Sequence, residues 1–334
     1  MGPAIAAVLL LAADWSALER HQQTITRAEF DKLLATVYCP SGAFTNYLAC
    51  TTNAATIFST PAKTNALFTL HFSQSEIPNP PSPIRRVALD PGHIGGDWAQ
   101  FEERHFVRDN DKPVEEAALN LTVARLLKTR LEAAGLTVLL TKTNLTPVTD
   151  KRPPDARSDI AARARLINTE LKPDLTVCIH FNAAPWNEHR DLVADNHLTV
   201  FVHGNYLPDE LASDETKFHL FSKLLERSHA TELAVADAVA RSLARATGLP
   251  PLPVSDNSAP ITDNPYLLLR NLGMNRQTHG PVIYLEPYYM NNRLVYQRLQ
   301  LGDYDGEKPV GGKTYRSIFR EYADAVADAV PTRR

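Results

Sequence analysis

The 334-residue sequence contains only three cysteines, which are too few for a disulfide framework and lack the paired spacing of a zinc finger. A metal site in this chain must therefore take its ligands from histidine and carboxylate side chains. Cys39 and Cys50 lie in one polar, turn-rich stretch, whereas Cys178 lies in an apolar run. The first two cysteines either form a bridge in an oxidising compartment or remain free thiols, since spacing alone does not establish the geometry of a disulfide.

An excess of positive charge is also missing. The formal net charge is −3, and no block of like charge appears along the chain. This balance excludes the electrostatic footprint of a nucleic-acid-binding protein. With 44% hydrophobic and 22% charged residues, the composition is that of a globular protein, long enough for one large domain and a smaller one.

A membrane-spanning apolar run is absent as well. The ten-residue run at 4–13 is too short to cross a bilayer, although its length suits the apolar region of a secretory signal. The LAA before Asp14 resembles a cleavage site, but no Lys or Arg precedes the run. Residues 1–14 are therefore either a degenerate signal segment or the start of a core helix. The first alternative predicts a periplasmic or extracellular protein.

The remaining chain is predicted to form two units joined by a linker. Residues 15–75 contain a helical stretch at 27–37 and short strands at 54–58 and 66–72, which indicates a small α+β unit without recognisable chemistry. Residues 76–84 include four prolines and indicate a stiff linker. The role of the small unit stays open.

From residue 85 to residue 330, apolar β-rich runs alternate with helical patterns. Strands are predicted at 87–90, 137–141, 175–181, 198–204 and 281–286, and helices at 114–134, 156–170, within 215–247 and at the C-terminal end. This order predicts an α/β domain with a largely parallel sheet flanked by helices. In such sheets, ligands bind outside the carboxyl ends of the strands.

Three polar residues follow or end predicted strands. His93 comes after VALDPG, His180 lies near the end of LTVCIHF, and Glu286 ends PVIYLE. Taken alone, the segment from Asp90 to Gly92 fits a type II turn, which would leave His93 without a special role. His180 alone fits a buried core histidine, and Glu286 alone fits a partner of an arginine. Together, the three indicate a site at one edge of the sheet.

A fourth polar residue comes from the predicted helix at 114–134. At about 100° per residue, Glu116 projects between Val123 and Leu127, in the middle of the apolar face, whereas Glu115 lies at its edge. Burial of an unpaired carboxylate costs several kcal/mol, roughly, so Glu116 must be protonated, paired or bound to a metal. Two histidines and a glutamate with one open position form the ligand set of a hydrolytic zinc site, and Glu286 then suits a general base.

These motifs identify a family. The sequence resembles the zinc-dependent N-acetylmuramoyl-L-alanine amidases in four motifs. They are LDPGH, which Ile94 separates from two following glycines, Glu116 before Asn120-Leu121, IHFNA at 179–183 and YLEPYYMNN at 284–292. The resemblance covers residues 85–330, and the motifs follow one another in the same order as in the family. Lesser matches are LLTK at 139–142, where the family usually has Thr-Arg, and the helix at 163–168.

The resemblance implies a zinc ion held by His93, Glu116 and His180, with Glu286 as the catalytic acid/base. It also implies a peptidoglycan or muropeptide substrate, cut between the muramic acid lactyl group and L-alanine. No regulatory protein partner is identified. We further expect Asp90 or Asn182 to orient the ligand histidines, because metal-bound imidazoles usually donate their second N–H to an oxygen acceptor.

The loop between the first two expected ligands departs from the family, because it is longer and more charged than the usual glycine-rich turn. Its Glu102, Glu103 and His105 are candidates for a competing ligand. Two other function classes stay open: a zinc peptidase that cuts within the stem peptide, and a non-catalytic wall-binding protein on the same fold.

Residues 205–229 are predicted to form an amphipathic helix that has no place in the core of the sheet. Some members of the resembled family carry an inserted helix that blocks the zinc. The two alternatives for this segment are therefore an inhibitory lid and an outer packing helix.

Overall fold

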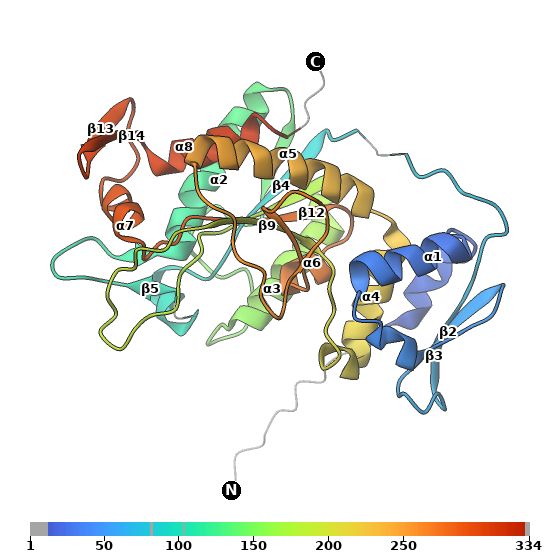
Figure 1. Cartoon of the computed structure of the whole chain (residues 1–334). Helices are drawn as coiled ribbons and strands as arrows, with labels where there is room; N and C mark the ends of the chain where they lie inside the picture. Colours follow the sequence, from blue (N-terminus) through green and yellow to red (C-terminus); the bar gives the residue numbers. More distant parts are fainter. Residues whose placement is uncertain (1–12, 81–82, 103, 331–334) are drawn as a thin grey trace, which may run out of the picture. The chain divides into compact units, whose positions relative to one another are not determined.

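The computed structural model describes residues 13–80, 83–102 and 104–330 (Figure 1). The prediction of a signal segment at residues 1–14 thus falls almost wholly outside the described residues. The chain divides into two compact units, one made of Met1–Pro78 with Tyr206–Glu226 and the other of Asn79–Asn205 with Arg227–Arg334. Among the described helices, none is both long and apolar enough to cross a bilayer.

The larger unit is built on a seven-stranded sheet with the order β10-β11-β9-β12-β8-β4-β7. Its strands are β4 (Arg86–Pro91), β7 (Thr137–Leu140), β8 (Leu175–Ile179), β9 (Leu198–His203), β10 (Ala259–Pro260), β11 (Leu267–Arg270) and β12 (Val282–Pro287). The neighbours β7, β4, β8 and β12 run parallel, whereas β9 runs antiparallel to β12 and parallel to β11. Strand β10 pairs antiparallel with β11. The predicted largely parallel sheet is confirmed.

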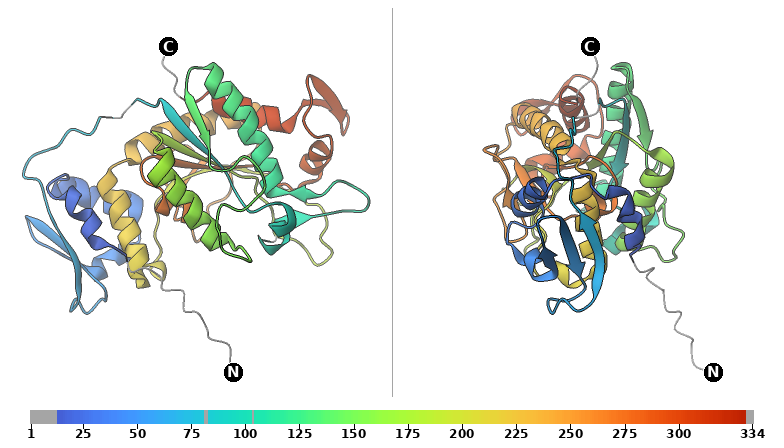
Figure 2. Two further views of the ribbon diagram at one scale, coloured as in Figure 1. Left: turned by 180° about the vertical axis from the view of Figure 1, so that it is seen from behind. Right: turned by 90° about the vertical axis from the view of Figure 1, so that its right-hand side faces the viewer.

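Helices cover both faces of this sheet (Figures 1 and 2). One face carries α2 (Glu116–Ala133), α5 (His229–Thr247) and α8 (Ile318–Ala327), and the other carries α3 (Ala156–Leu166) and α6 (Gly273–Gln277). Every residue of β8 and β9 is buried, which explains why these strands read as unbroken apolar runs. A capping box between Asp155 and Ser158 sets the start of α3.

The remaining elements of this unit lie at its margins. They are η4 (Gly96–Glu102), the two-residue strands β5 (His105–Phe106) and β6 (Val114–Glu115), the helical turn η5 (Ile167–Leu171), α7 (Arg293–Gln300) and the hairpin of β13 (Glu307–Val310) with β14 (Lys313–Arg316).

The strand register places three chain segments at one level. Ile179 of β8 pairs with Pro91 of β4 on one side and with Leu285 of β12 on the other. Because these three strands run parallel, the residues that follow Pro91 and Ile179, together with Glu286, meet at the same edge of the sheet. This is the edge at which ligands bind in open α/β sheets.

The smaller unit has a three-stranded antiparallel sheet and several short helices. The strands are β1 (Leu48–Cys50), β2 (Ala54–Phe58) and β3 (Ala66–His71), and the helical elements are η1 (Trp15–His21), α1 (Arg27–Leu33), η2 (Leu34–Tyr38), η3 (Ala43–Tyr47), η6 (Glu210–Ala212) and α4 (Asp214–Glu226). The predicted small N-terminal α+β unit is therefore present. Cys39 and Cys50 are both free thiols in it.

Helix α4 completes the core of the smaller unit, although it follows β9 of the larger one in the chain. The ring of Phe221 lies 5.6 Å from that of Phe30 and 6.1 Å from that of Phe68, between ring centroids. Lys217, which is fully buried, donates from Nζ to the backbone oxygens of Ser59 and Leu211, each at 3.1 Å. The sequence predicts an outer helix or a lid of the domain at 85–330, whereas the apolar face of α4 packs within the N-terminal unit.

Candidate metal centre

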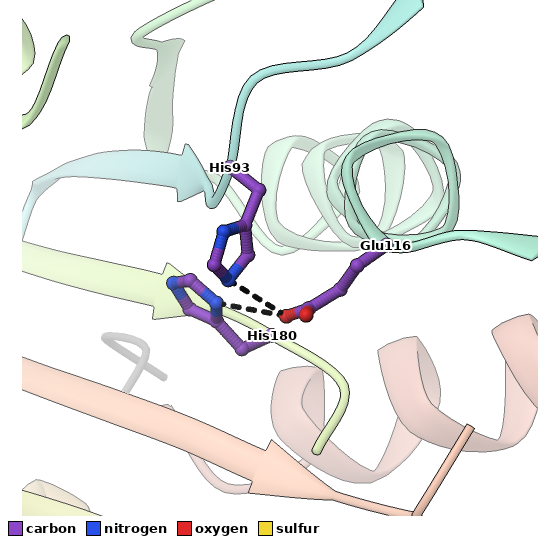
Figure 3. A group of neighbouring side chains, drawn as sticks. All are labelled: His93, Glu116 and His180. Atoms are coloured by element: carbon purple, nitrogen blue, oxygen red, sulfur yellow. Dashed lines mark hydrogen bonds and ion pairs between the residues drawn. The ribbon is translucent and has the colours of Figure 1, made fainter. Parts of the chain in front are cut away.

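Three of the predicted residues come together at the carboxyl ends of the parallel strands (Figure 3). His93 follows β4, His180 follows β8, and Glu116 is the first residue of α2. One nitrogen of each histidine and one carboxylate oxygen all lie within 4.8 Å of one another. The buried position of Glu116, predicted from helical periodicity, is observed: this residue is 2% exposed.

The carboxylate of Glu116 lies between the two imidazoles. Its Oε1 is 3.2 Å from Nε2 of His93 and 3.0 Å from Nδ1 of His180, as the dashed lines in Figure 3 show. The backbone N–H of Phe181 also donates to this oxygen, at 3.3 Å. The ring of Tyr284 stacks on His180 with centroids 4.2 Å apart, which fixes the plane of that imidazole.

The backbone around His93 is specialised for this close arrangement. His93 itself has φ of 64°, a left-handed conformation that is uncommon outside glycine. A Cβ atom on Gly92 would lie 1.8 Å from Cε1 of His180, so only glycine fits between the two histidines. The alternative of a type II turn is wrong in its key feature, because that turn needs a positive φ at Gly92, and the positive φ falls on His93.

Glu102 orients His93. Its Oε2 accepts from Nδ1 of His93 at 3.0 Å and from the backbone N–H of Ile94 at 2.7 Å. This pairing turns Nε2 of His93 toward Glu116 and makes Nδ1 the protonated nitrogen. The sequence suggests Glu102 as a competing ligand, whereas the structure places it as a hydrogen-bond partner of the candidate ligand His93.

The residues expected to orient the histidines have other partners. Asp90 accepts from the hydroxyl of Thr141 at 2.6 Å and forms a buried ion pair with Arg163. The side-chain oxygen of Asn182 accepts from the backbone N–H of Ala183 at 2.8 Å. Neither side chain bonds to a histidine among the described residues, so these contacts give the predicted orienting role no support.

Asp90 and the neighbouring Lys142 instead hold the turn that carries His93. The ion pair of Asp90 with Arg163 ties the end of β4 to α3, and Asp159, one turn earlier in α3, also pairs with Arg163 at 3.0 Å. Lys142, 6% exposed, donates from Nζ to the backbone oxygens of Gly92 and His93. The LLTK match thus contributes two residues, Thr141 and Lys142, that fix this turn.

The other loop candidates lie apart from the cluster. His105 belongs to β5 and pairs across the hairpin with Glu115 of β6. Glu103 lies outside the described residues.

Burial and neighbouring charges shift the pKa values of the three residues of the cluster in different directions. Burial alone raises the pKa of Glu116, but the two neighbouring imidazoles outweigh it and hold this pKa well below its usual range. Burial lowers the pKa of His93, yet the carboxylates of Glu116 and Glu102 more than compensate and raise it to about 9. Burial and the nearby His93 lower the pKa of His180 to about 4. The proton on His93 and the guanidinium of Arg104, whose Nε lies 3.8 Å from Oε2 of Glu116, thus balance the buried carboxylate.

The charge of the cluster affects the pKa of Glu286, at the end of β12, although Glu286 forms no bond to the cluster. Burial, reinforced by the negative charge of Glu116, raises the pKa of its carboxyl group to about 7. Its carboxylate forms no hydrogen bond or ion pair with any side chain in the described part of the chain. The alternative of a structural partner for an arginine therefore finds no support here.

The donor set fits a zinc ion. The two distances from Glu116 to the imidazoles are 3.0 and 3.2 Å, and all three donor atoms lie within 4.8 Å of one another, so they are grouped closely enough to share one ion. Two neutral imidazoles and one carboxylate are ligands that zinc commonly takes in hydrolytic sites. The carboxylate of Glu102 on His93 adds the outer hydrogen bond that usually accompanies a ligand histidine.

Comparison with known proteins gives similar solved structures but no curated relative. No curated protein matches the chain significantly. Among solved structures, the chain is similar to the CwlD amidase from Clostridioides difficile in complex with the GerS lipoprotein, with 15% identity, a TM-score of 0.46 and coverage of 73% of this chain and 94% of that one. It is also similar to the catalytic domain of CwlV, an N-acetylmuramoyl-L-alanine amidase from Bacillus (Paenibacillus) polymyxa var. colistinus, with 18% identity, a TM-score of 0.44 and coverage of 74% and 96%.

A family model covers most of the larger unit. The model described as N-acetylmuramoyl-L-alanine amidase matches residues 87–318, a range that includes α2, β8, β12 and all of β4 except Arg86, and therefore every residue of the cluster. This match extends over more than half of the chain. The chain belongs to the N-acetylmuramoyl-L-alanine amidase family.

Proposed function

We propose that this protein is a zinc-dependent hydrolase that cuts the amide bond between the lactyl group of N-acetylmuramic acid and the first L-alanine of the peptidoglycan stem peptide. The observation that carries the proposal is the convergence of His93, Glu116 and His180 within a domain that matches the amidase family. Peptidoglycan lies outside the cytoplasm, so the proposal includes a periplasmic or extracellular site of action.

His93, Glu116 and His180 would hold the zinc ion, each through the atom that faces the common point of the cluster. When bound there, zinc supplies Lewis acidity, which polarises an amide carbonyl and makes a water molecule more acidic. The carboxylate of Glu102 keeps Nδ1 of His93 protonated and Nε2 free for the ion. The ion would also take the place of the proton that otherwise helps to balance Glu116.

Glu286 would carry the proton between water and the leaving group. A general base works best when its pKa is close to the working pH, and the pKa of Glu286 is raised to about 7. Its carboxylate is half-buried and not held by another side chain, so it is free to accept a proton from the attacking water. It would then return that proton to the L-alanine nitrogen as the C–N bond breaks.

Digestion of purified peptidoglycan tests this function. Mass spectrometry of the products should show glycan strands with free lactyl carboxyl groups and peptides with a free L-alanine amino group. A chelator should abolish the release and added zinc should restore it. Cleavage between two amino acids would instead establish a zinc peptidase, and binding of the wall by zinc-loaded protein without hydrolysis would establish a non-catalytic wall-binding protein.

A further inference from the structure

A pocket lies where two long loops of the larger unit meet. Its volume is about 380 Å³, and its wall includes Phe106, Arg108 and Asp109 from the loop after β5 and Trp186, His189 and Arg190 from the loop between β8 and β9. In Figure 1 both loops extend from the same side of the unit, near the label of β5. None of these residues has a role in the proposed mechanism.

Each loop is connected to a proposed zinc ligand: the loop after β5 ends at β6, directly before Glu116, and the other loop begins at His180. On one side, the backbone N–H of Glu116 donates to the oxygen of Arg104 at 3.0 Å, and the next residue, His105, pairs across the hairpin with Glu115. On the other side, Trp186 is the sixth residue after His180. Strand geometry therefore puts the near wall of the pocket within roughly 10 Å of Glu116. An extended peptide advances about 3.5 Å per residue, so a substrate held at the metal would reach the pocket with its second or third residue after the cut bond.

The polar side of the pocket is positive. Arg108 and Arg190 contribute two guanidinium groups, against the single carboxylate of Asp109. Nη1 of Arg108 donates to the backbone oxygen of Arg190 at 2.7 Å, which joins the two loops and leaves the other N–H groups of Arg108 available. In the described part of the chain, the side chains of Arg190 and His189 have no hydrogen-bond or ion-pair partner.

The apolar side of the pocket is a fixed aromatic wall. The rings of Phe106 and Trp186 meet edge to face with centroids 4.9 Å apart, and Phe106 stacks on Tyr296 at 6.0 Å. The hydroxyl of Tyr296 donates to Asp111 at 2.7 Å, which fastens this wall to the same loop. Phe106 is 7% exposed, whereas Trp186 is partly exposed and thus offers a ring face to a ligand.

We propose that this pocket is a specificity subsite that binds a free carboxylate of the acidic stem peptide through Arg108 and Arg190, with Trp186 covering the aliphatic part of the same residue. The proposal rests on the proposed amidase function and names the part of the substrate that the long loop after His93 recognises. Guanidinium groups suit this task because their paired N–H donors match a carboxylate in geometry and charge.

The test compares two muramoyl tripeptides, one with free peptide carboxylates and one with those carboxylates amidated. The unaltered enzyme should cleave the free-acid substrate with a kcat/KM at least about tenfold higher, the effect of one lost charge-assisted contact. The double variant R108Q/R190Q should lose this preference, mostly through a higher KM for the free acid. Trp186→Ala should weaken binding of both substrates.

The control variant R165Q/R245Q removes the same charge from two exposed arginines on α3 and α5, and it should keep the preference. An unchanged preference in R108Q/R190Q, or a preference that follows the glycan and not the carboxylates, would overturn the subsite while leaving the amidase function intact. If the unaltered protein cleaves neither substrate, the proposed function fails. Calorimetric binding of the free-acid tripeptide to the same variants then decides the subsite separately.

Discussion

The two units of this protein differ in how their residues are brought together. In the larger unit, the cluster at the sheet edge comes from segments whose local patterns already indicate strand ends and a helix face. In the smaller unit, the core requires α4, which is more than a hundred residues distant in the chain from the strands it covers. Local sequence patterns therefore predict the candidate site of the larger unit, but they do not predict which helix completes the core of the smaller unit.

The largest expected effect tests whether Glu286 acts in proton transfer and not in zinc binding. Glu286→Gln should lower kcat by about 10² to 10⁴-fold, because the amide cannot accept a proton, while the bound zinc stays stoichiometric. Metal analysis and turnover on a soluble muropeptide measure both quantities. His180→Ala should lose zinc and activity together. The exposed Glu170 provides a matched control, since Glu170→Gln should change neither; nearly normal turnover by the Glu286 variant would move the base elsewhere.

The next effect asks whether α4 stabilises the smaller unit specifically. Phe221→Ala removes a fully buried ring and should lower the free energy of unfolding of that unit by about 3 to 5 kcal/mol. Hydrogen exchange should show lost protection in β2 and β3, with zinc binding retained. Leu131→Ala in α2 is the converse variant, because it opens a cavity in the larger unit. Equal loss of protection in both units from either change would contradict separate cores.

A smaller effect sharpens the role of Glu102 within the larger unit. Glu102→Gln removes the charge that orients His93 and should weaken zinc binding by about 10 to 100-fold, the usual cost of losing an outer partner of a ligand histidine. Competition with a chromogenic chelator measures the affinity. Asp97→Asn alters an exposed carboxylate in the same loop and should bind zinc normally. Equal affinities for the two variants would rule out orientation by Glu102.

The smallest effect concerns protons released at the metal centre. The pKa of His93 is raised to about 9, so this residue is protonated at pH 7 and zinc binding should release about one proton per ion. Zinc affinity should therefore rise with pH up to about 9. The stability of the zinc-free protein changes with pH in the opposite direction. The pairing of protonated His93 stabilises the fold fully below the ordinary histidine pKa of 6.5, and this stabilisation is lost as the pH rises through about 9. Calorimetry at pH 7 in buffers of different ionisation enthalpy counts the protons, and a count of zero would mean a neutral His93.

Much of the candidate site could be predicted because it depends on local periodicity. A run of buried β-formers predicts a strand and its end, and helical spacing alone predicts that Glu116 is buried. Glu102 was not recognised as an orienting residue, because its position relative to His93 is set by η4 and not by any repeating pattern. The need for glycine at residue 92 was likewise missed, since it arises from the ring of His180 on the adjacent strand.

The sequence by itself determined the alternation of strands and helices, the parallel segments that end in His93, His180 and Glu286, and the burial of Glu116. These features follow from hydrophobic spacing over a few neighbouring residues, where side-chain direction repeats with the backbone. Only the tertiary structure decided that β9 runs antiparallel to β12, that α4 joins the N-terminal unit, and that Glu102 holds His93. Each of these depends on contacts between segments far apart in the chain, and such pairings are selected by packing of the whole core and not by local preference.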